Sequence, residues 1–509
     1  MSKKWLTVLS VAILSLMTTN TAFAFTQESY SKQVSVEVHN TSTTSLHLNG
    51  IYKLENLSTN EMFYALPDTS ITFSQVNGEV SIYQIGATMY SSKGFALHAL
   101  SGNEKMVVFT SDVDGKKGAT SDYETIKTYK AFQGAYYVNE FTNANGELWY
   151  SVTDEQGVSS WIPAKDASVG SVVKQPLGKT PNGTQYRSSF NVVKSGANVQ
   201  IVNRLDLENY LKGVIPNESY ASWHQEALKA QAVAARSYTL SKAGILSSTT
   251  KDQMYKGFTS EKTSTNSAVD ATNGLVVKSG GKLVQAYYYA ASGGRTANIG
   301  EVWNTAQVPH FVSVDDSIEK SPYDNWSVNI PATNILTKFG FSTSAQLLDV
   351  KLTKGGSNGE VSAVTVVTSA GEKTITGNET VMRGLFLDAN NTSLKSNWFD
   401  IQFTKPSGVT DLAVQQVNGT TPITSLSGTT VQTATGTETI PSGSVNIQTN
   451  GGIVSTTATS GIPSITVNGK GYGHRIGMSQ WGAKARADAG WTYDRILKHY
   501  YQGATIEKY

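Results

Sequence analysis

The chain has 509 residues, enough for roughly two to four domains, and a formal net charge of only +2. This balance excludes a strongly basic protein, so charge points neither to nucleic acid as a partner nor to attraction by other anionic polymers. Cysteine is absent, which excludes disulfides and Cys-based metal sites and leaves hydrophobic cores to stabilise the fold.

Residues 1–24 have the pattern of a secretory signal peptide. Two lysines precede an apolar run over 6–17, and Ala22-Phe-Ala24 provides a small-x-small cleavage site. The run is shorter than the ~20 residues of a membrane span. We therefore expect cleavage before Phe25 and a secreted protein. An uncleaved membrane anchor is the alternative.

Residues 25–110 consist of short apolar runs separated by Asn, Ser, Gly and Asp, a pattern typical of strands joined by turns. The clearest strands are expected at 34–38 and 46–54. This part of the chain is therefore predicted to be a β-rich N-terminal region.

A further module is expected at residues 111–172. Within it, residues 147–162 predict two strands around an acidic turn that contains glycine, closing on Trp161-Ile162. The pattern resembles a bacterial SH3-like wall-binding module. An ordinary β-hairpin is the alternative.

Glu218 follows Val-Ile-Pro-Asn and stands just before a strongly patterned helix. A carboxylate at such a boundary can be held at a fixed depth, partly out of water, which raises its pKa and makes it a candidate general acid. The alternative is a solvated loop glutamate, or a first-turn charge favoured by the helix dipole.

A long Ala-rich helix is predicted over 223–241, because Ser222 and Gln225 form a capping-box pattern at its start. Helical spacing places Gln225, Lys229 and Arg236 on one face. Lys229 is expected either on a solvated face or in the wall of a site. The apolar neighbours of Arg236 suggest burial, and a buried arginine needs a partner, usually a carboxylate.

Residues 286–296 predict a strand followed by a tight turn at Ser292. A serine nucleophile there would need a base, and His310 is the nearest histidine in sequence, an arrangement that we do not favour. Asp315 and Asp316 are candidates for the second carboxylate that a two-carboxylate glycoside hydrolase requires.

Residues 401–463 are rich in Thr, Ser and Gly and carry few charges. Alternating runs such as 443–448 predict edge strands, and a linker is the alternative. We expect no chemistry in this stretch.

The run 469–483 is spaced by glycines at positions 469, 471, 473 and 477, which lets the backbone turn sharply and approach a ligand. It does not match G-x-G-x-x-G and has no βαβ context, so dinucleotide binding is rejected. His474, Ser479 and Gln480 suit sugar hydroxyls, and Trp481 suits a pyranose face. The alternative is a structural turn in which Ser479 caps a helix.

Several stretches together resemble the stage II sporulation protein D (SpoIID)/amidase-enhancer family. They lie, in order, at residues 203–240, 252–257, 268–274, 286–296 with Trp303, 469–483 and 496–503. Each stretch alone is weakly specific, but their common order is highly specific. A SpoIID-like catalytic core is therefore expected over 173–400, interrupted by an insertion at 401–463 and completed by residues 464–509.

The resemblance implies a protein that acts on peptidoglycan in the envelope of spore-forming and related bacteria. Some relatives resemble lytic transglycosylases that cut glycan strands stripped of stem peptides, and others are described as enhancers of an N-acetylmuramoyl-L-alanine amidase. The family's catalytic glutamate falls on Glu218 and its helix arginine on Arg236. We expect the substrate site to be lined by Lys229, Ser292, Gly293, Gly473, His474, Ser479, Gln480 and Trp481.

The chain departs from the family pattern in two respects. Relatives usually have Gly after the motif histidine, whereas Arg475 stands here, where it is expected to add a cation to the cleft or to block part of it. Some relatives are thought to carry a metal through Cys and His residues. Because this chain has no cysteine, neither a metal nor another cofactor is expected.

The expected fold is α+β: a mainly β framework with the long helix, short C-terminal helices near 479–489 and 493–501, and the β-rich, SH3-like insert. One strong carboxylate favours a lytic transglycosylase that cuts peptidoglycan glycan strands. The second hypothesis is a non-enzymatic enhancer with a cell-wall amidase as partner, and the third hypothesis is a protein that only binds the wall. The sequence does not separate a sporulation role from one in vegetative growth.

Overall fold

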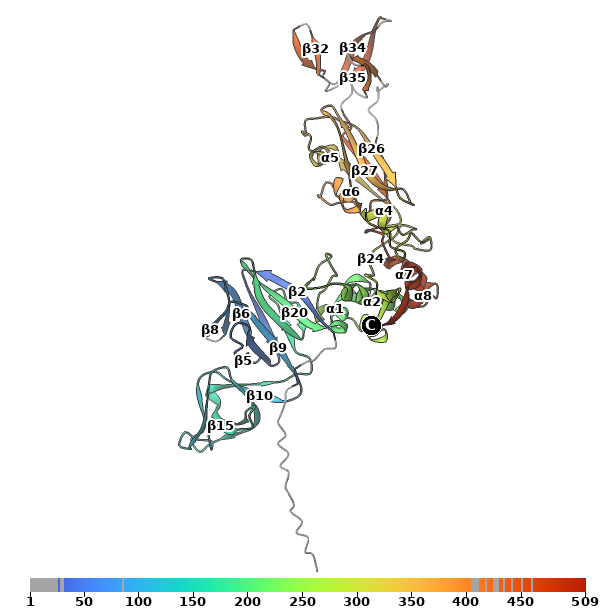
Figure 1. Ribbon diagram of the computed structural model, residues 1–509. Coiled ribbons are helices and arrows are strands. Elements are labelled where there is room, and N and C mark those ends of the chain that lie inside the picture. Colours follow the sequence, from blue (N-terminus) through green and yellow to red (C-terminus); the bar gives the residue numbers. More distant parts are fainter. Residues whose placement is uncertain are drawn as a thin grey trace, which may run out of the picture. The chain divides into compact units, whose positions relative to one another are not determined.

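The computed structural model describes residues 32–84, 87–403 and 461–509, and in addition the segments 26–27, 412–416, 419–423, 430–433, 435–440, 443–449 and 452–458 (Figure 1). Most of the described secondary structure is β-strand, which confirms the expected α+β, mainly β fold. By contacts, the chain forms two compact units. Unit 1 comprises residues up to 210 with 244–259, and unit 2 comprises 211–243 with 260–509.

Unit 1 is built on two largely antiparallel sheets, with strand orders β21-β2-β20-β19-β9-β4-β5 and β18-β17-β3-β6-β7-β8, and the short β1 pairs with β9. Their strands are β1 (Thr26–Gln27), β2 (Gln33–Thr41), β3 (Thr43–Asn49), β4 (Tyr52–Asn56), β5 (Met62–Tyr64), β6 (Ser70–Val76), β7 (Glu79–Gln84), β8 (Ala87–Ser91), β9 (Phe95–Ser101), β17 (Leu177–Lys179), β18 (Gln185–Arg187), β19 (Ser189–Ser195), β20 (Asn198–Asp206) and β21 (Leu246–Ser247).

The strand expected at 34–38 lies within β2, but the single strand expected at 46–54 is wrong. Two strands, β3 and β4, occupy that stretch and are separated at Gly50. Gly50 has a φ of +101°, a conformation that favours glycine, and the chain therefore turns there instead of continuing extended.

A third sheet in unit 1, here called the inserted sheet, has the order β12-β11-β15-β14-β13-β10-β16. Its strands are β10 (Lys105–Phe109), β11 (Val113–Lys116), β12 (Thr125–Tyr129), β13 (Gly134–Thr142), β14 (Leu148–Thr153), β15 (Ser159–Pro163) and β16 (Ala167–Ser171). The predicted pair of strands within 147–162 is confirmed, because β14 and β15 pair antiparallel. The sheet packs a small core of its own around Phe109, Val152 and Ile162.

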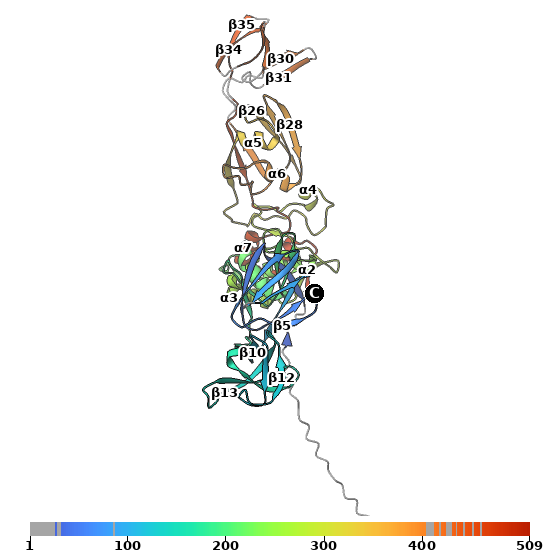
Figure 2. The same ribbon diagram turned by 90° about the vertical axis from the view of Figure 1, so that its left-hand side faces the viewer.

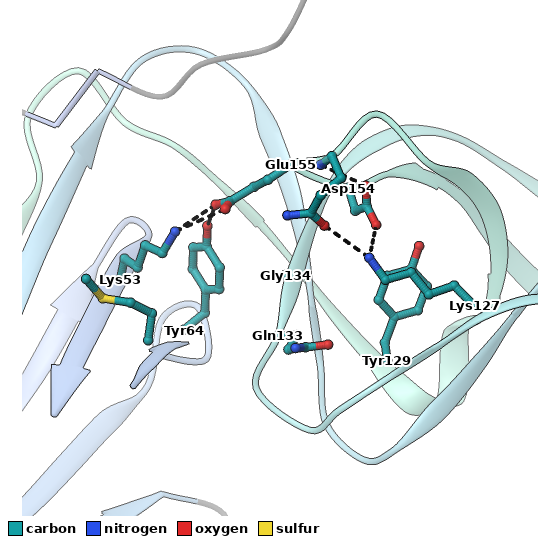
Figure 3. Close-up of a pocket in the computed structure, with 10 residues that line it drawn as sticks. Lys53, Tyr64, Lys127, Tyr129, Gln133, Gly134, Asp154 and Glu155 are labelled. Carbon is teal, nitrogen blue, oxygen red and sulfur yellow. Dashed lines mark hydrogen bonds and ion pairs between the residues drawn. The ribbon is translucent and has the colours of Figure 1, made fainter. Parts of the chain in front are cut away.

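The turn between β14 and β15 joins the inserted sheet to β4 and β5 (Figure 3). Glu155 in this turn accepts hydrogen bonds from Lys53 at 2.9 Å and from Tyr64 at 2.5 Å. Burial alone would raise the pKa of the Glu155 carboxyl, but the Tyr64 hydroxyl and the Lys53 charge outweigh it and hold the pKa below its usual value. A buried phenol and an ion pair thus connect the two sheets.

The described residues of unit 2 form two hydrophobic cores. The first core packs helix α2 against the C-terminal helices α7 and α8 through residues such as Val233, Met478 and Leu497. Its elements are the end of α1 (Leu207–Glu218), α2 (Gln225–Ser241), α3 (Thr263–Ala271), β22 (Leu275–Ser279), β23 (Lys282–Leu283), β24 (Tyr288–Tyr289), α4 (Ile299–Trp303), β37 (Met478–Ser479), α7 (Gln480–Asp488), α8 (Tyr493–Tyr500) and β38 (Thr505–Lys508).

The second core is inserted into the first along the chain and is centred on Ile330, Phe339 and Val364. Helices α5 and α6 lie beside its strands in both views (Figure 1 and Figure 2). The elements are β25 (Trp326–Pro331), α5 (Ala332–Phe339), β26 (Leu347–Gly355), β27 (Glu360–Thr368), β28 (Gly371–Thr376), α6 (Glu379–Leu385), β29 (Phe399–Gln402) and β36 (Ser464–Gly469).

The start of α2 differs from the prediction. The helix begins at Gln225, and the side chain of His224, not of Ser222, accepts the backbone N–H of Glu226. A turn closed by the hydrogen bond from Trp223 N to Tyr220 O precedes the helix and takes up the residues expected in its first turn. The two short C-terminal helices are confirmed as α7 and α8.

Two predicted segments lie largely outside the described residues. Nothing of the expected signal peptide, 1–24, is described. Of the insertion at 401–463, the described strands β30 (Leu412–Gln416), β31 (Gly419–Ile423), β32 (Thr430–Thr433), β33 (Gly436–Thr439), β34 (Gly443–Thr449) and β35 (Gly452–Ala458) pair as antiparallel hairpins. In the part of the chain that can be described, no helix combines the length and apolar character of a membrane span.

Candidate functional site

Glu218 is the last residue of α1, where its side chain is half-buried. The end of this helix is anchored by Asn217, whose amide donates to Gly213 O at 2.8 Å and to Ser260 Oγ at 2.9 Å. Gln480 Nε2 donates to Glu218 Oε2 at 3.4 Å. Two residues predicted for the site, far apart in sequence, are thus brought together at the start of α7.

Three aromatic rings cluster beside this pair. The ring of Trp223 lies 5.2 Å from that of Trp481 and 5.5 Å from that of Tyr220, between centroids. Tyr220 is 64% exposed, so the cluster offers an aromatic surface to solvent. Aromatic faces of this kind suit the apolar face of a pyranose ring. Sequence reasoning proposed Trp481 but missed Tyr220 and Trp223, although both follow Glu218 within five positions.

The start of α7 is fixed by a neighbouring segment. Strand β24 pairs in parallel with β37, and Trp481 N donates to Ala290 O at 3.0 Å. Ser479 caps α7 by accepting the Gly482 N–H at 3.1 Å, which confirms the capping alternative for this residue. Capping is compatible with a site nearby, because the cap fixes the start of α7 and therefore the positions of the Gln480 and Trp481 side chains.

A buried carboxylate that the sequence did not reveal holds this arrangement together. Glu319 is 3% exposed and accepts hydrogen bonds from Ser292 Oγ at 2.9 Å, from Gly293 N at 3.2 Å and from Ser479 Oγ. Burial and the nearby Asp316 raise the pKa of the Glu319 carboxyl above its usual value, against the effect of these hydrogen bonds. Glu319 thus ties the turn at Ser292 to the cap of α7 and acts as a positioning residue.

The serine-nucleophile alternative finds no support in these contacts. The hydroxyl of Ser292 donates to Glu319, while His310 packs its ring on Phe311 with centroids 4.5 Å apart. Hydrolysis by a second carboxylate at 315 or 316 also lacks support.

Asp316 is fully buried and is engaged by Arg486 and by the Tyr500 hydroxyl, the latter at 2.9 Å. Asp315 accepts the Ser317 hydroxyl at 2.9 Å. Neither carboxylate contacts Glu218 in the described structure. Within the described residues, no group of three or more His, Cys, Asp or Glu side chains is placed to hold a metal ion.

His474 is surrounded by aromatic rings, with centroids 5.1 Å from Trp303 and 5.4 Å from Tyr289. Burial lowers the pKa of its imidazole from 6.5 to about 4, with Glu379 and Arg383 acting in opposite directions. Its Nδ1 accepts the backbone N–H of Ile476 at 3.1 Å, which assigns the ring proton to Nε2. Near neutral pH the residue is therefore an uncharged hydrogen-bond donor.

This assignment predicts a pH-dependent stability. Between about pH 6.5 and about pH 4 the unfolded chain binds a proton at His474 that the folded chain does not bind, so stability falls as the pH falls. The melting temperature of the parent should therefore drop more steeply from pH 7 to pH 5 than that of His474→Gln. Parallel curves for the two proteins would show that His474 titrates normally.

The predicted glycines bring backbones into close contact. A Cβ on Gly293 would lie 2.5 Å from Gly471 N, and one on Gly473 would lie 2.7 Å from Tyr289 Cβ. Gly293 and Gly473 also have φ values of +72° and +108°. Any side chain here would separate the two loops, so these glycines shape the site, and their contact with substrate stays a prediction.

The two polar residues predicted on α2 have different surroundings. Arg236 is fully buried, as expected, and donates to the carbonyls of Val269 at 3.3 Å and Leu275 at 3.1 Å. Lys229 pairs with Glu226 at 2.7 Å. The role of Arg236 beside Glu218 and that of Lys229 in binding substrate stay predictions.

The expectation for Arg475 is wrong. Its side chain is fully buried, so it neither adds a cation to a cleft nor blocks one. It pairs with Glu360 at 3.0 Å, donates to Ser292 O at 3.1 Å, and stacks on Trp398 at 4.1 Å from the ring centroid. Glu360 lies in β27 and Trp398 directly precedes β29, so Arg475 connects the glycine run to two strands of the second core.

Comparisons with known proteins show which family this chain is similar to. Residues 195–278 match the family model described as stage II sporulation protein, SpoIID. The chain is 35% identical over 313 residues to the amidase enhancer of Bacillus subtilis (strain 168), covering 59% of this chain and 40% of that protein. It therefore spans less than half the length of that relative.

Two further relatives are covered over most of their length. The chain is 28% identical over 331 residues to stage II sporulation protein D of Bacillus subtilis (strain 168), covering 61% of this chain and 76% of that protein. It is 29% identical over 349 residues to an uncharacterized protein of Brachyspira hyodysenteriae (strain ATCC 49526 / WA1), covering 67% and 77%. These matches confirm the resemblance to the SpoIID family, with the family model itself matched over residues 195–278.

Proposed function

We propose that this protein is secreted to the cell wall and cleaves peptide-stripped glycan strands of peptidoglycan as a lytic transglycosylase, with Glu218 as its acid and base. The observation that carries the proposal is a half-buried carboxylate at a helix end, held beside Gln480 and next to the exposed aromatic cluster. A sugar stacked on these rings would present a glycosidic bond to a carboxyl that is fixed in position.

A single carboxyl is sufficient for this reaction. As an acid, Glu218 donates its proton to the glycosidic oxygen while the bond from that oxygen to muramic C1 breaks. As a base, the resulting carboxylate takes the proton of the muramic C6 hydroxyl, whose oxygen then bonds to C1. The products are a shortened strand and a 1,6-anhydro-muramic end, no water is consumed, and Glu218 regains its proton.

A second function is favoured by one comparison. The amidase enhancer of Bacillus subtilis is 35% identical to this chain over 313 residues. A non-enzymatic protein that binds the wall and raises the activity of an N-acetylmuramoyl-L-alanine amidase would use the same surface for binding without needing the proton transfer. In that case the inserted sheet, as an SH3-like module, would add wall affinity.

Product analysis tests the proposal. The protein without residues 1–24 is incubated with peptidoglycan whose stem peptides have been removed by an amidase, and the soluble products are identified by mass spectrometry. We expect strands that end in 1,6-anhydro-muramic acid. Reducing ends in their place would indicate hydrolysis, and the absence of any cleavage together with stimulation of an added amidase would favour the enhancer function.

A further inference from the structure

A groove with a volume of about 660 Å³ opens on one face of the sheet β25-β36-β29 in unit 2. The register places Ser327, Asn468 and Asp400 side by side across the three strands. Because side chains alternate between the two faces of a strand, residues two positions before or after these three point to the same face of the sheet. Those that also line the groove are Asn325, Trp398, Gln402 and Lys470.

The opposite face of the same sheet belongs to the second core. Trp326 and Phe399 are 8% and 2% exposed, and they flank Gly469 on the central strand. A Cβ on Gly469 would lie 2.1 Å from the ring of Trp326, so only glycine at this position leaves room for the ring. The groove floor is therefore supported by a packed apolar layer, which makes it a preformed surface.

Trp398 gives the groove an aromatic wall. Its half-buried ring is stacked on the buried guanidinium of Arg475 at 4.1 Å from the centroid, which holds the indole in place. The exposed ammonium of Lys470 is 5.4 Å from the same centroid. A rigid aromatic ring next to amide side chains is the usual make-up of a surface that stacks on a sugar and hydrogen-bonds its hydroxyl and acetamido groups.

The charges in the groove indicate which kind of sugar it would bind. Asp400 is paired with Lys354, whereas no carboxylate of the described residues pairs with the ammonium of Lys470. The groove therefore carries one unbalanced positive charge at the end where Trp398 lies. A sugar that stacks on the ring of Trp398 and carries a carboxylate on a short substituent could form an ion pair with Lys470.

We propose that this groove is a second glycan-binding subsite, in which Trp398 stacks on a sugar and Lys470 pairs with the lactyl carboxylate of muramic acid. The ligand class rests on the proposed function. Removing a stem peptide from muramic acid converts a lactyl amide into a free carboxylate, so Lys470 would distinguish stripped strands from strands that still carry peptides. Asn325 and Asn468 would bind the neighbouring hydroxyl and acetamido groups.

Binding measurements in a Glu218→Gln background, which prevents cleavage, test this subsite. The probes are amidase-stripped glycan strands and chitooligosaccharides of similar length, which lack the lactyl carboxylate. Lys470→Gln should weaken binding of stripped strands about fivefold and leave binding of chitooligosaccharides unchanged. Asn468→Ala should weaken binding of both probes about threefold to fivefold. Lys351→Gln, an exposed lysine of β26 outside the groove, is the matched control.

Trp398→Ala should weaken binding of both probes about tenfold or more, provided that its melting temperature shows a folded protein. The variants Asn468→Ala and Lys470→Gln change surface side chains, so the subsite can be tested even if Trp398→Ala does not fold. If both of them bind stripped strands like Lys351→Gln, the subsite is wrong. If Lys470→Gln weakens both probes equally, the carboxylate assignment is wrong. Cleavage by the parent protein is measured in a separate assay. If the parent does not cleave glycan, but the groove variants bind it more weakly than the control, the proposed function is wrong and the subsite is still supported.

Discussion

Glu218→Gln is expected to lower the rate of glycan cleavage about 10²–10⁴-fold, because an amide cannot donate the proton that the leaving sugar oxygen needs near neutral pH. The replacement keeps the shape of the side chain and its hydrogen bond with Gln480. The variant should therefore fold and bind glycan like the parent. Cleavage is measured as the release of 1,6-anhydro-muramic ends from stripped peptidoglycan.

The matched control is Glu372→Gln, which removes an exposed carboxylate of β28 in the same unit and should leave cleavage unchanged. A Glu218→Gln variant that still cleaves at the parental rate would remove Glu218 from the mechanism. If neither protein cleaves and both stimulate an added amidase equally, the enhancer function is correct and the site serves binding alone.

Arg475→Ala is expected to lower the free energy of unfolding by about 3–5 kcal/mol, the range for breaking one side of a buried ion pair. Its loss leaves Glu360 buried at 3% exposure without its cation, and removes the stacking partner of Trp398. The donor to Ser292 O disappears as well, so the glycine run should loosen from the second core. Urea denaturation followed by tryptophan fluorescence measures the change.

A double-mutant cycle with Glu360→Gln separates the ion pair from the other contacts of Arg475. Glu360→Gln alone should also destabilise the protein, since it leaves the guanidinium buried without a carboxylate. The double variant should be less destabilised than the sum of the two single variants. Additivity within about 0.5 kcal/mol would show that the pair is not coupled and that the other contacts of Arg475 account for the loss.

Features that depend on neighbouring residues could be predicted from the sequence. The β14–β15 hairpin follows from alternating residues around a short acidic turn with glycine, and α7 follows from a serine cap before a helical run. The sequence also placed Glu218 at an element boundary before the Ala-rich helix, but it did not predict α1, of which Glu218 is the last residue. The family resemblance also rests on such local motifs.

Contacts between distant parts of the chain were decided only by the tertiary structure. Nothing near Glu319 indicates that it would accept hydrogen bonds from residues 292 and 479, and nothing near Arg475 names Glu360 as its partner. The groove is likewise assembled from three strands that lie apart in sequence. A sequence shows that a buried charge needs a partner, because the cost of burying it is general, but which group supplies that partner depends on how the two cores of unit 2 pack.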